Sequence, residues 1–398
     1  MRKKFLMRLL TCITAFLLLT QGTITAQAQE SVFSNERDPL YSASMYLGEI
    51  MELILDKYAN GPVSLDELFE AAVGGMTEIL DIYSRYLSKE EYEAFTDSLS
   101  GRLVGIGIII AQNADGTLDI VRVLPSSPAN DAGLKRGDRL ITVNGINVDD
   151  KPVSEVVGII QNQEISNIRI TISRNGLEYI FNMVKREIPS ATVFVDKFED
   201  LLGPDYAKYS SSSRYIAIAS IGETTAVDLS EAVDSVMREG VRNIILDLRG
   251  NSGGYLDEAV DICRLIVPAG PILHTIDSRG ERETIRSRLP FKPFENIIVL
   301  VDGTTASAAE LIAAALQDSK AATIIGETTY GKGVIQRMYP LISGGVLIVT
   351  TEEYLRRSGA KINGIGVRPD IGIFGMSPAS YETKNDAALL KALELLNL

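Results

Sequence analysis

The sequence predicts an α+β protein of several domains, with a helical region near its N-terminus, a β-rich unit after it and an α/β core towards its C-terminal end. Helix-period apolar patterns fill residues 40–96, and short strand-like runs separated by turn residues fill residues 100–187. From about residue 188 strand-like and helical runs alternate, as in parallel βαβ units. At 398 residues and 45% hydrophobic content, the chain is long enough to bury several cores.

Residues 1–28 have the pattern of an export signal. Four basic residues stand at or before the start of the apolar run Leu9–Leu19, and Ala26-Gln27-Ala28 follows as a small-residue cleavage pattern. The apolar run is short for a transmembrane helix, so a cleaved signal is expected. An uncleaved membrane anchor, with membrane association through the N-terminus, stays open as the alternative.

Residues 29–98 are expected to form an N-terminal helical region. The apolar spacing predicts helices over Ser42–Tyr58 and Ser64–Leu80, separated by the turn Asn60-Gly61-Pro62, and a short helix from Ser88.

Residues 99–187 are expected to form the β-rich domain. Runs that are apolar and rich in β-branched residues predict four strands, at Ile106–Ala111, Leu118–Val123, Arg139–Val143 and Ile168–Ser173. A helix is expected near Val153–Asn162.

Residues 188–398 are expected to form the α/β core, ending in a short helix. Alternating patterns predict, in order, strand Tyr215–Ile221, helix Thr225–Gly240, strand Ile244–Leu248, helix Leu256–Ile266, strand Ile297–Val301, helix Ser307–Gln317 and helix Asp386–Leu396.

Two segments of this core carry candidate reactive residues. Ser307 stands at the start of a predicted helix, where unpaired N–H groups and the helix dipole favour an oxyanion. Lys332 lies between two glycines and near apolar side chains that would desolvate its amine, and desolvation lowers the pKa of a lysine. Gln336 projects to the same side of an extended segment. A plain capping role for Ser307, with Glu310 completing a capping box, stays open.

Other kinds of chemistry have less support in the sequence. The one histidine, His274, lies in an apolar run without an acidic residue placed to orient it, so a Ser-His-Asp triad is not expected. Cys263 falls within an apolar helical pattern typical of a buried free thiol. Neither a metal nor another cofactor is expected, and the net charge of -13 argues against a nucleic-acid partner.

The reactive segments resemble the carboxy-terminal processing, or tail-specific, serine protease family. The resemblance lies in Thr305 to Leu311, in Tyr330 to Gln336, in Asp247 to Gly254 and in Gly359 to Asp370. Leu80 to Leu87 is similar to a further motif of these proteases, with Ile82 in place of a proline.

The resemblance implies a core of the crotonase/ClpP-like class and assigns roles to individual residues. Ser307 would be the nucleophile, Lys332 the general base and Gln336 the residue that orients the lysine. The amides of Gly253 and Ala308 would form the oxyanion hole. Asp318 matches an aspartate implicated in some members, although its place at a helix end suggests a structural role.

The β-rich unit resembles a PDZ domain. Its motifs stand in the family order, from Gly105-Ile106-Gly107-Ile108 through Ser127-Pro128-Ala129 to Val143-Asn144-Gly145. In such a domain a peptide tail adds a strand to a sheet edge, while the backbone amides of Gly105, Ile106, Gly107 and Ile108 bind the terminal carboxylate.

Together these resemblances imply an endopeptidase exported across a bacterial cytoplasmic membrane, which recognises substrate C-termini and cleaves or processes proteins near them. The expected partners are polypeptides with free C-termini, and the N-terminal helices leave a homodimer open. A free substrate tail is expected to shift the PDZ domain so that the catalytic residues align. Two other classes stay open: an inactive PDZ peptide-binding scaffold and a non-peptide acyl hydrolase.

Overall fold

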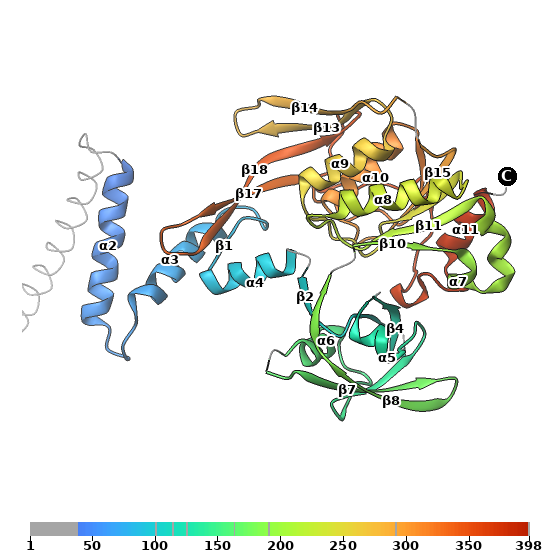
Figure 1. Cartoon of the computed structure of the whole chain (residues 1–398). Coiled ribbons are helices and arrows are strands. Elements are labelled where there is room, and N and C mark those ends of the chain that lie inside the picture. The colour runs from blue at the N-terminus through green and yellow to red at the C-terminus, as the bar shows by residue number, and fades with distance from the viewer. Residues whose placement is uncertain are drawn as a thin grey trace, which may run out of the picture. The chain divides into compact units, whose positions relative to one another are not determined.

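The computed structural model describes residues 39–99, 102–113, 115–124, 126–162, 164–189, 192–290 and 293–396 (Figure 1). The predicted export signal or anchor, residues 1–28, lies outside the described residues. Within the described part of the chain, every helix is too short or too polar to cross a membrane. The chain divides into two compact units, Met1–Leu80 and Asp81–Leu398.

The described part of the first unit consists of two helices, α2 (Pro39–Lys57) and α3 (Leu65–Glu78), which confirm two predicted helices. Ser64 begins α3 as its N-cap. Its hydroxyl accepts a hydrogen bond from Glu67 N at 3.1 Å, and the Glu67 carboxylate accepts one from Ser64 N at 2.7 Å. This reciprocal pair satisfies two N–H groups that a helix start otherwise leaves unpaired.

The second unit begins with a short strand and a helix, β1 (Arg85–Leu87) and α4 (Lys89–Leu99). The β-rich domain follows. Its six-stranded sheet has the order β3-β4-β5-β7-β8, with β6 paired to β5, so that β3 lies at an edge. The elements are β3 (Ile108–Gln112), β4 (Leu118–Val123), α5 (Pro128–Ala132), β5 (Arg139–Val143), β6 (Ile146–Asn147), α6 (Val153–Gln161), β7 (Asn167–Arg174) and β8 (Leu177–Val184).

A two-stranded antiparallel ribbon, β2 (Arg102–Gly105) with β9 (Arg186–Pro189), stands where the chain enters and leaves this domain. The domain has its own core of alternating inward side chains, among them Leu118, Ile120, Ile170 and Ile172.

The α/β core is built on a second six-stranded sheet, of order β10-β11-β12-β15-β16-β19, in which all pairs except β10 with β11 are parallel. Its strands are β10 (Val193–Asp196), β11 (Ser213–Ile218), β12 (Asn243–Asp247), β15 (Asn296–Val301), β16 (Ala322–Gly326) and β19 (Ile371–Gly372).

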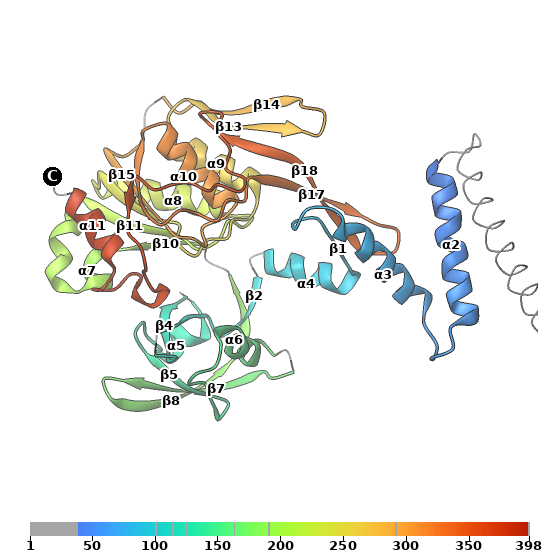
Figure 2. The same cartoon turned by 180° about the vertical axis from the view of Figure 1, so that it is seen from behind.

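Helices cover both faces of this sheet, so its central strands are almost wholly apolar. On one face lie α8 (Thr225–Arg238), α9 (Leu256–Ile266) and α10 (Ala308–Asp318) (Figure 1). On the other lie α7 (Phe198–Leu202) and α11 (Ala387–Leu396), next to each other in Figure 2. A 3₁₀ segment, η1 (Pro204–Ser211), completes this layer, and a second, η2 (Pro378–Ser380), lies against β3 of the β-rich domain.

A smaller sheet completes the core. The long strand β18 (Val346–Arg356) pairs with β1, β13 (Gly270–Asp277) and β17 (Val334–Pro340), and β14 (Arg282–Ser287) pairs with β13. Through β1 the segment before the β-rich domain is therefore held in the core sheet, with Arg85 opposite Ile348.

Candidate active site

Ser307 lies between strand β15 and helix α10. The Asp302 carboxylate folds the intervening turn by accepting hydrogen bonds from Thr304 N and Thr305 N, each at 2.9 Å. Ser307 is the N-cap of α10, with φ of 54°. A positive φ is strained for a non-glycine residue, and the surrounding hydrogen bonds hold it. The turn thus presents a half-buried serine at the positive end of an 11-residue helix.

The amide of Ala308 is available to a ligand. Its N–H is the first of α10 and finds no hydrogen-bond partner among the described residues. Such a group, next to the serine and at a helix N-terminus, is suited to stabilise negative charge on an oxygen bound to the substrate carbon.

Glu310 connects the two candidate catalytic residues. This fully buried carboxylate accepts hydrogen bonds from Ser307 N at 2.8 Å, from Lys332 N at 2.8 Å and from Gly331 N at 2.7 Å. Thr329 donates its hydroxyl hydrogen to the same carboxylate. One side chain therefore fixes the backbone at both Ser307 and Lys332, which stand far apart in sequence.

Close backbone packing explains the glycines on either side of Lys332. A Cβ on Gly331, whose φ is +91°, would lie 3.1 Å from Gly366 N, and a Cβ on Gly333 would lie 2.4 Å from Asn363 N. Any larger residue would move the segment that carries the lysine.

The surroundings of Lys332 favour the neutral form of its amine over the charged form. Burial is the largest cause of the lowered pKa of Lys332, and the Arg85 cation lowers that pKa further, while Asp81 opposes the shift. The Nζ atom lies 5.0 Å from the centroid of the Tyr83 ring. A lysine with a lowered pKa is a better proton acceptor near neutral pH than an exposed one.

A buried tyrosine from β18 lies between the same two residues. The Tyr354 hydroxyl is 2.9 Å from Ser307 O and 2.7 Å from Lys332 O. Because it has one hydrogen, it donates to one of these carbonyl oxygens at a time. Tyr354 thus supports the backbone at both Ser307 and Lys332.

Ser307, Lys332 and Gln336 line one cavity of about 350 Å³, called here the catalytic cavity. Among the described residues, no hydrogen bond joins the Ser307 and Lys332 side chains. The Gln336 amide donates to Thr350 Oγ1 at 3.4 Å, not to the lysine. The structure brings the three predicted residues together, and their alignment for catalysis stays a prediction.

The predicted oxyanion glycine packs against the serine. A Cβ on Gly253, whose φ is +99°, would lie 2.9 Å from Ser307 Cβ and 3.0 Å from Ala308 N. Its own N–H, however, donates to Asn251 Oδ1 at 2.8 Å. Two amides, of Gly253 and Ala308, were expected to form the oxyanion hole. In this conformation the Ala308 amide is available and the Gly253 amide is not, so the role of Gly253 stays a prediction.

The loop that carries Gly253 is anchored by a buried arginine. Arg249 forms ion pairs with Asp247 at 2.6 Å and with Asp386 at 2.7 Å, and its guanidinium lies 4.0 Å from the centroid of the Tyr381 ring. Asp386 directly precedes α11. Through the ion pair of Arg249 with Asp386, the motif at Asp247 to Gly254 therefore also ties the C-terminal helix to the sheet.

Sequence reasoning missed the part played by the segment from Asp81 to Leu87. Tyr83 and Arg85 line the catalytic cavity, and Asp81 and Ser84 bond to Thr350 on β18 at 3.1 and 3.0 Å. The motif was visible in the sequence, but its position beside Lys332 depends on the pairing of β1 with β18.

The remaining candidates lie elsewhere. His274 lies outside the lining of the catalytic cavity and contacts Thr284 Oγ1 at 2.8 Å. Cys263 is fully buried in α9, and burial raises the pKa of its thiol. Asp318 bonds to Arg356 and to Ser358 N, as a structural residue would.

The predicted carboxylate-binding loop lies next to a small groove. Gly105 to Ile108 line a cavity of about 50 Å³ together with Ile110 of β3 and Val157, Ile160 and Gln161 of α6. The N–H groups of Ile106 and Gly107 find no partner within the described ranges. Strand β3 is the sheet edge beside this groove.

Comparisons with known proteins agree with this architecture. Residues 213–373 match the model of peptidase family S41, and residues 120–174 match a PDZ domain. The carboxy-terminal processing protease CtpA of Bacillus subtilis is 33% identical over 309 residues, which cover 77% of this chain and 64% of that protein. The chain thus spans less than two thirds of that relative.

Two further relatives match more of their own length. The carboxy-terminal-processing protease of Bartonella bacilliformis is 30% identical over 363 residues, covering 89% of this chain and 80% of that protein. The solved photosystem II D1 C-terminal processing protease superposes with a TM-score of 0.51 and 25% identity, over 87% of this chain and 92% of that one. The chain belongs to the carboxy-terminal processing protease family, the S41 serine-type peptidases, and carries a PDZ domain.

Proposed function

We propose that this chain is an endopeptidase in which Ser307 attacks the substrate and Lys332 acts as general base. The observation that carries the proposal is their position in one cavity, with the pKa of Lys332 lowered chiefly by burial. Catalytic hydrogen bonds are often long in the free enzyme and shorten when substrate binds, so the open arrangement is compatible with this role.

The reaction proceeds in two acyl transfers. Neutral Lys332 Nζ takes the proton of Ser307 Oγ while Oγ bonds to the peptide carbonyl carbon. The Ala308 amide and the dipole of α10 stabilise the oxyanion. When the C–N bond breaks, Lys332 returns the proton to the leaving amine. Water, activated by the same lysine, then hydrolyses the ester on Ser307.

Hydrolysis of an unstructured protein by the purified chain tests this mechanism. Ser307→Ala and Lys332→Ala should each abolish turnover, because one removes the nucleophile and the other the base. Gln336→Ala should lose less, since an orienting residue transfers no proton. A variant that keeps the wild-type rate removes its residue from the mechanism.

Recognition of substrate C-termini is the second part of the proposal. The unpaired amides of Ile106 and Gly107 suit a carboxylate, and the edge strand β3 suits an added peptide strand. Amidating the C-terminus of a model substrate removes the carboxylate charge and should slow its cleavage. Equal rates for free and amidated substrates would reject carboxylate recognition.

A polar contact offers a route by which the PDZ domain affects the core. Arg122 on β4 pairs with Asp196 at 3.0 Å and with Glu382 at 2.6 Å, and Glu382 also contacts the Tyr215 hydroxyl at 3.1 Å. Tyr215 in turn donates to Asp247 at 2.5 Å. We propose that tail binding shifts this contact and aligns the catalytic residues. Deleting the PDZ domain should then make cleavage insensitive to amidation.

Export and self-association complete the proposal. Residues 1–28 would direct the chain out of the cytoplasm, which fractionation of cells expressing the full chain tests. Large apolar side chains of α2 are exposed within their unit, among them Met45, Ile50 and Leu53. They would be covered in a homodimer. Light scattering after replacing all three by polar residues should show loss of the dimer.

A further inference from the structure

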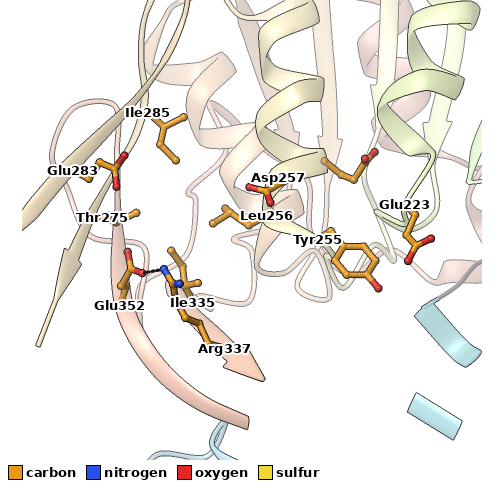
Figure 3. Close-up of a pocket in the computed structure, with 11 residues that line it drawn as sticks. Glu223, Tyr255, Leu256, Asp257, Thr275, Glu283, Ile285, Ile335, Arg337 and Glu352 are labelled. Atoms are coloured by element: carbon orange, nitrogen blue, oxygen red, sulfur yellow. Dashed lines mark hydrogen bonds and ion pairs between the residues drawn. The ribbon is translucent and has the colours of Figure 1, made fainter. Parts of the chain in front are cut away.

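A second cavity opens beside the catalytic one, with a volume of about 550 Å³. It is called here the acidic cavity (Figure 3). Tyr255, Leu256 and Ile335 line both cavities. Because the two share these side chains, the cavities are neighbours, and a polypeptide bound across Ser307 lies close to the acidic cavity.

The charged lining of this second cavity is strongly one-sided. It has five carboxylates and one guanidinium, which belong to Glu223, Asp257, Glu258, Glu283, Glu352 and Arg337. The guanidinium is already paired, with Glu352 at 2.9 Å, and the Glu258 carboxylate accepts a hydrogen bond from Ala226 N at 2.8 Å. Within the described part of the chain, Glu223, Asp257 and Glu283 have no ion-pair partner.

A buried hydroxyl also faces this space. Thr275 on β13 is only 5% exposed and lines the cavity, yet its Oγ1 forms no hydrogen bond with any described residue. Figure 3 shows Thr275 between Glu283 and Glu352. The oxygen itself is not fully enclosed, so it is accessible from the cavity but has no hydrogen-bond partner there within the described ranges. An occupant with a hydrogen-bond donor would supply it.

The spacing of the carboxylates selects the kind of cation. No three acidic, histidine or cysteine side chains among the described residues converge closely enough to hold a metal ion. The carboxylates instead stand on different elements around the cavity, with Asp257 on α9, Glu283 on β14 and Glu352 on β18. This distribution suits an extended cation that carries several N–H donors on a flexible stem.

We propose that the acidic cavity is a substrate subsite for a lysine or arginine side chain, a few residues from the scissile bond. The inference rests on the proposed peptidase function and adds a substrate preference to it. The basic side chain would enter past Tyr255 and Leu256, place its charge between Asp257 and Glu283, and donate a hydrogen bond to Thr275 Oγ1.

Binding to the full chain carrying Ser307→Ala tests the subsite without relying on hydrolysis. The probe is a fluorescent, neutral, unstructured peptide in which a single lysine replaces glutamine at each position in turn. At low ionic strength, lysine at one or two adjacent positions should bind about five- to tenfold more tightly than glutamine, as expected for a few partly exposed ion pairs.

Two further variants identify the groups responsible. Adding Asp257→Asn with Glu283→Gln should nearly abolish the preference, so that the lysine and glutamine peptides bind with affinities that differ by no more than about twofold. Adding Glu231→Gln with Asp234→Asn, which removes two exposed carboxylates from α8, should leave the ratio unchanged. Thr275→Val, which keeps the shape of the side chain, should lower the ratio less than the double variant does.

The outcomes separate this inference from the proposed function. Equal affinity at every lysine position, absence of binding, or a ratio that survives the double variant overturns the subsite. Position-dependent tight binding of peptides that the wild-type chain does not cut supports the subsite and rejects the peptidase. Loss of the lysine preference on adding calcium at constant ionic strength would show that the cavity takes a metal ion instead, which also overturns the proposal.

Discussion

Replacing Glu310 should show how much each of its two carboxylate oxygens contributes to stability and to catalysis. Oε2 accepts from Ser307 N and Lys332 N, while Oε1 accepts from Gly331 N and Thr329 Oγ1. In Glu310→Gln, the amide oxygen can keep the first pair. The new NH₂ group can then donate to the Thr329 hydroxyl, which already accepts a hydrogen bond from Val367 N.

The number of lost hydrogen bonds sets the expected magnitudes. In Glu310→Gln the Gly331 N–H and the Thr329 O–H are left without an acceptor, which costs about 2–4 kcal/mol of unfolding free energy. In Glu310→Ala three backbone N–H groups and the Thr329 O–H lose their acceptor and a cavity opens, so the cost should be roughly 4–8 kcal/mol. Release of both catalytic segments should also lower kcat/KM by about 100-fold or more, since small misplacements are costly.

Urea unfolding followed by circular dichroism measures the stabilities, and cleavage of an unstructured protein measures kcat/KM at a temperature where each variant is folded. Glu231→Ala, an exposed change on α8, is the matched control and should alter stability by no more than about 0.5 kcal/mol. A folded Glu310→Ala protein with the wild-type kcat/KM would refute the idea that this carboxylate positions the two residues. Equal damage from Gln and Ala would refute the assignment of the two oxygens.

Two further predictions follow from charges near the site. A neutral Lys332 is the competent base, so kcat/KM should rise with pH through the pKa of Lys332, which lies below its usual value because of burial and then of Arg85. Arg85→Gln removes the cation, raises that pKa and should move the pH profile to higher pH; an unmoved profile contradicts the assignment. Arg249→Met leaves two buried carboxylates, Asp247 and Asp386, unpaired and should cost about 3–5 kcal/mol in urea unfolding. A loss below about 1 kcal/mol would show that these carboxylates become protonated or hydrated.

Local pattern was enough to predict much of the core. Helix α9 and strands β4 and β5 have the predicted bounds, because their apolar periods are clean and turn residues flank them. The start of α10 was predicted within a residue, which placed Ser307 at the N-terminus of a helix. The family and the PDZ domain were identified from motifs and are confirmed by the comparisons.

Non-local contacts explain most of what the sequence could not predict. The pattern around Glu310 indicated a helix cap. Its hydrogen bonds to Gly331 and Lys332 join residues far apart in the sequence, which no local pattern predicts. Likewise, Gln336 was expected on the same side as Lys332 by simple alternation. Strand β17 instead has a register irregularity between Ile335 and Gln336, so alternation could not decide which way the amide points.

The acidic cavity also could not be predicted from the sequence, because its charged residues are brought together only by non-local contacts. Its carboxylates come from segments that run from Glu223 to Glu352, and none of them stands in a recognisable motif. Only the folding of α9, β14, β18 and the turn before α8 around one space gathers them.

The central claim is that the neutral amine of Lys332 activates Ser307, and covalent labelling tests it most directly. A fluorophosphonate should modify Ser307 alone, as located by mass spectrometry of the digested protein. The labelling rate should rise with pH through the lowered pKa of Lys332 and should fall by about 100-fold or more in Lys332→Met. Labelling at the wild-type rate in that variant, or on a residue other than Ser307, would contradict the account.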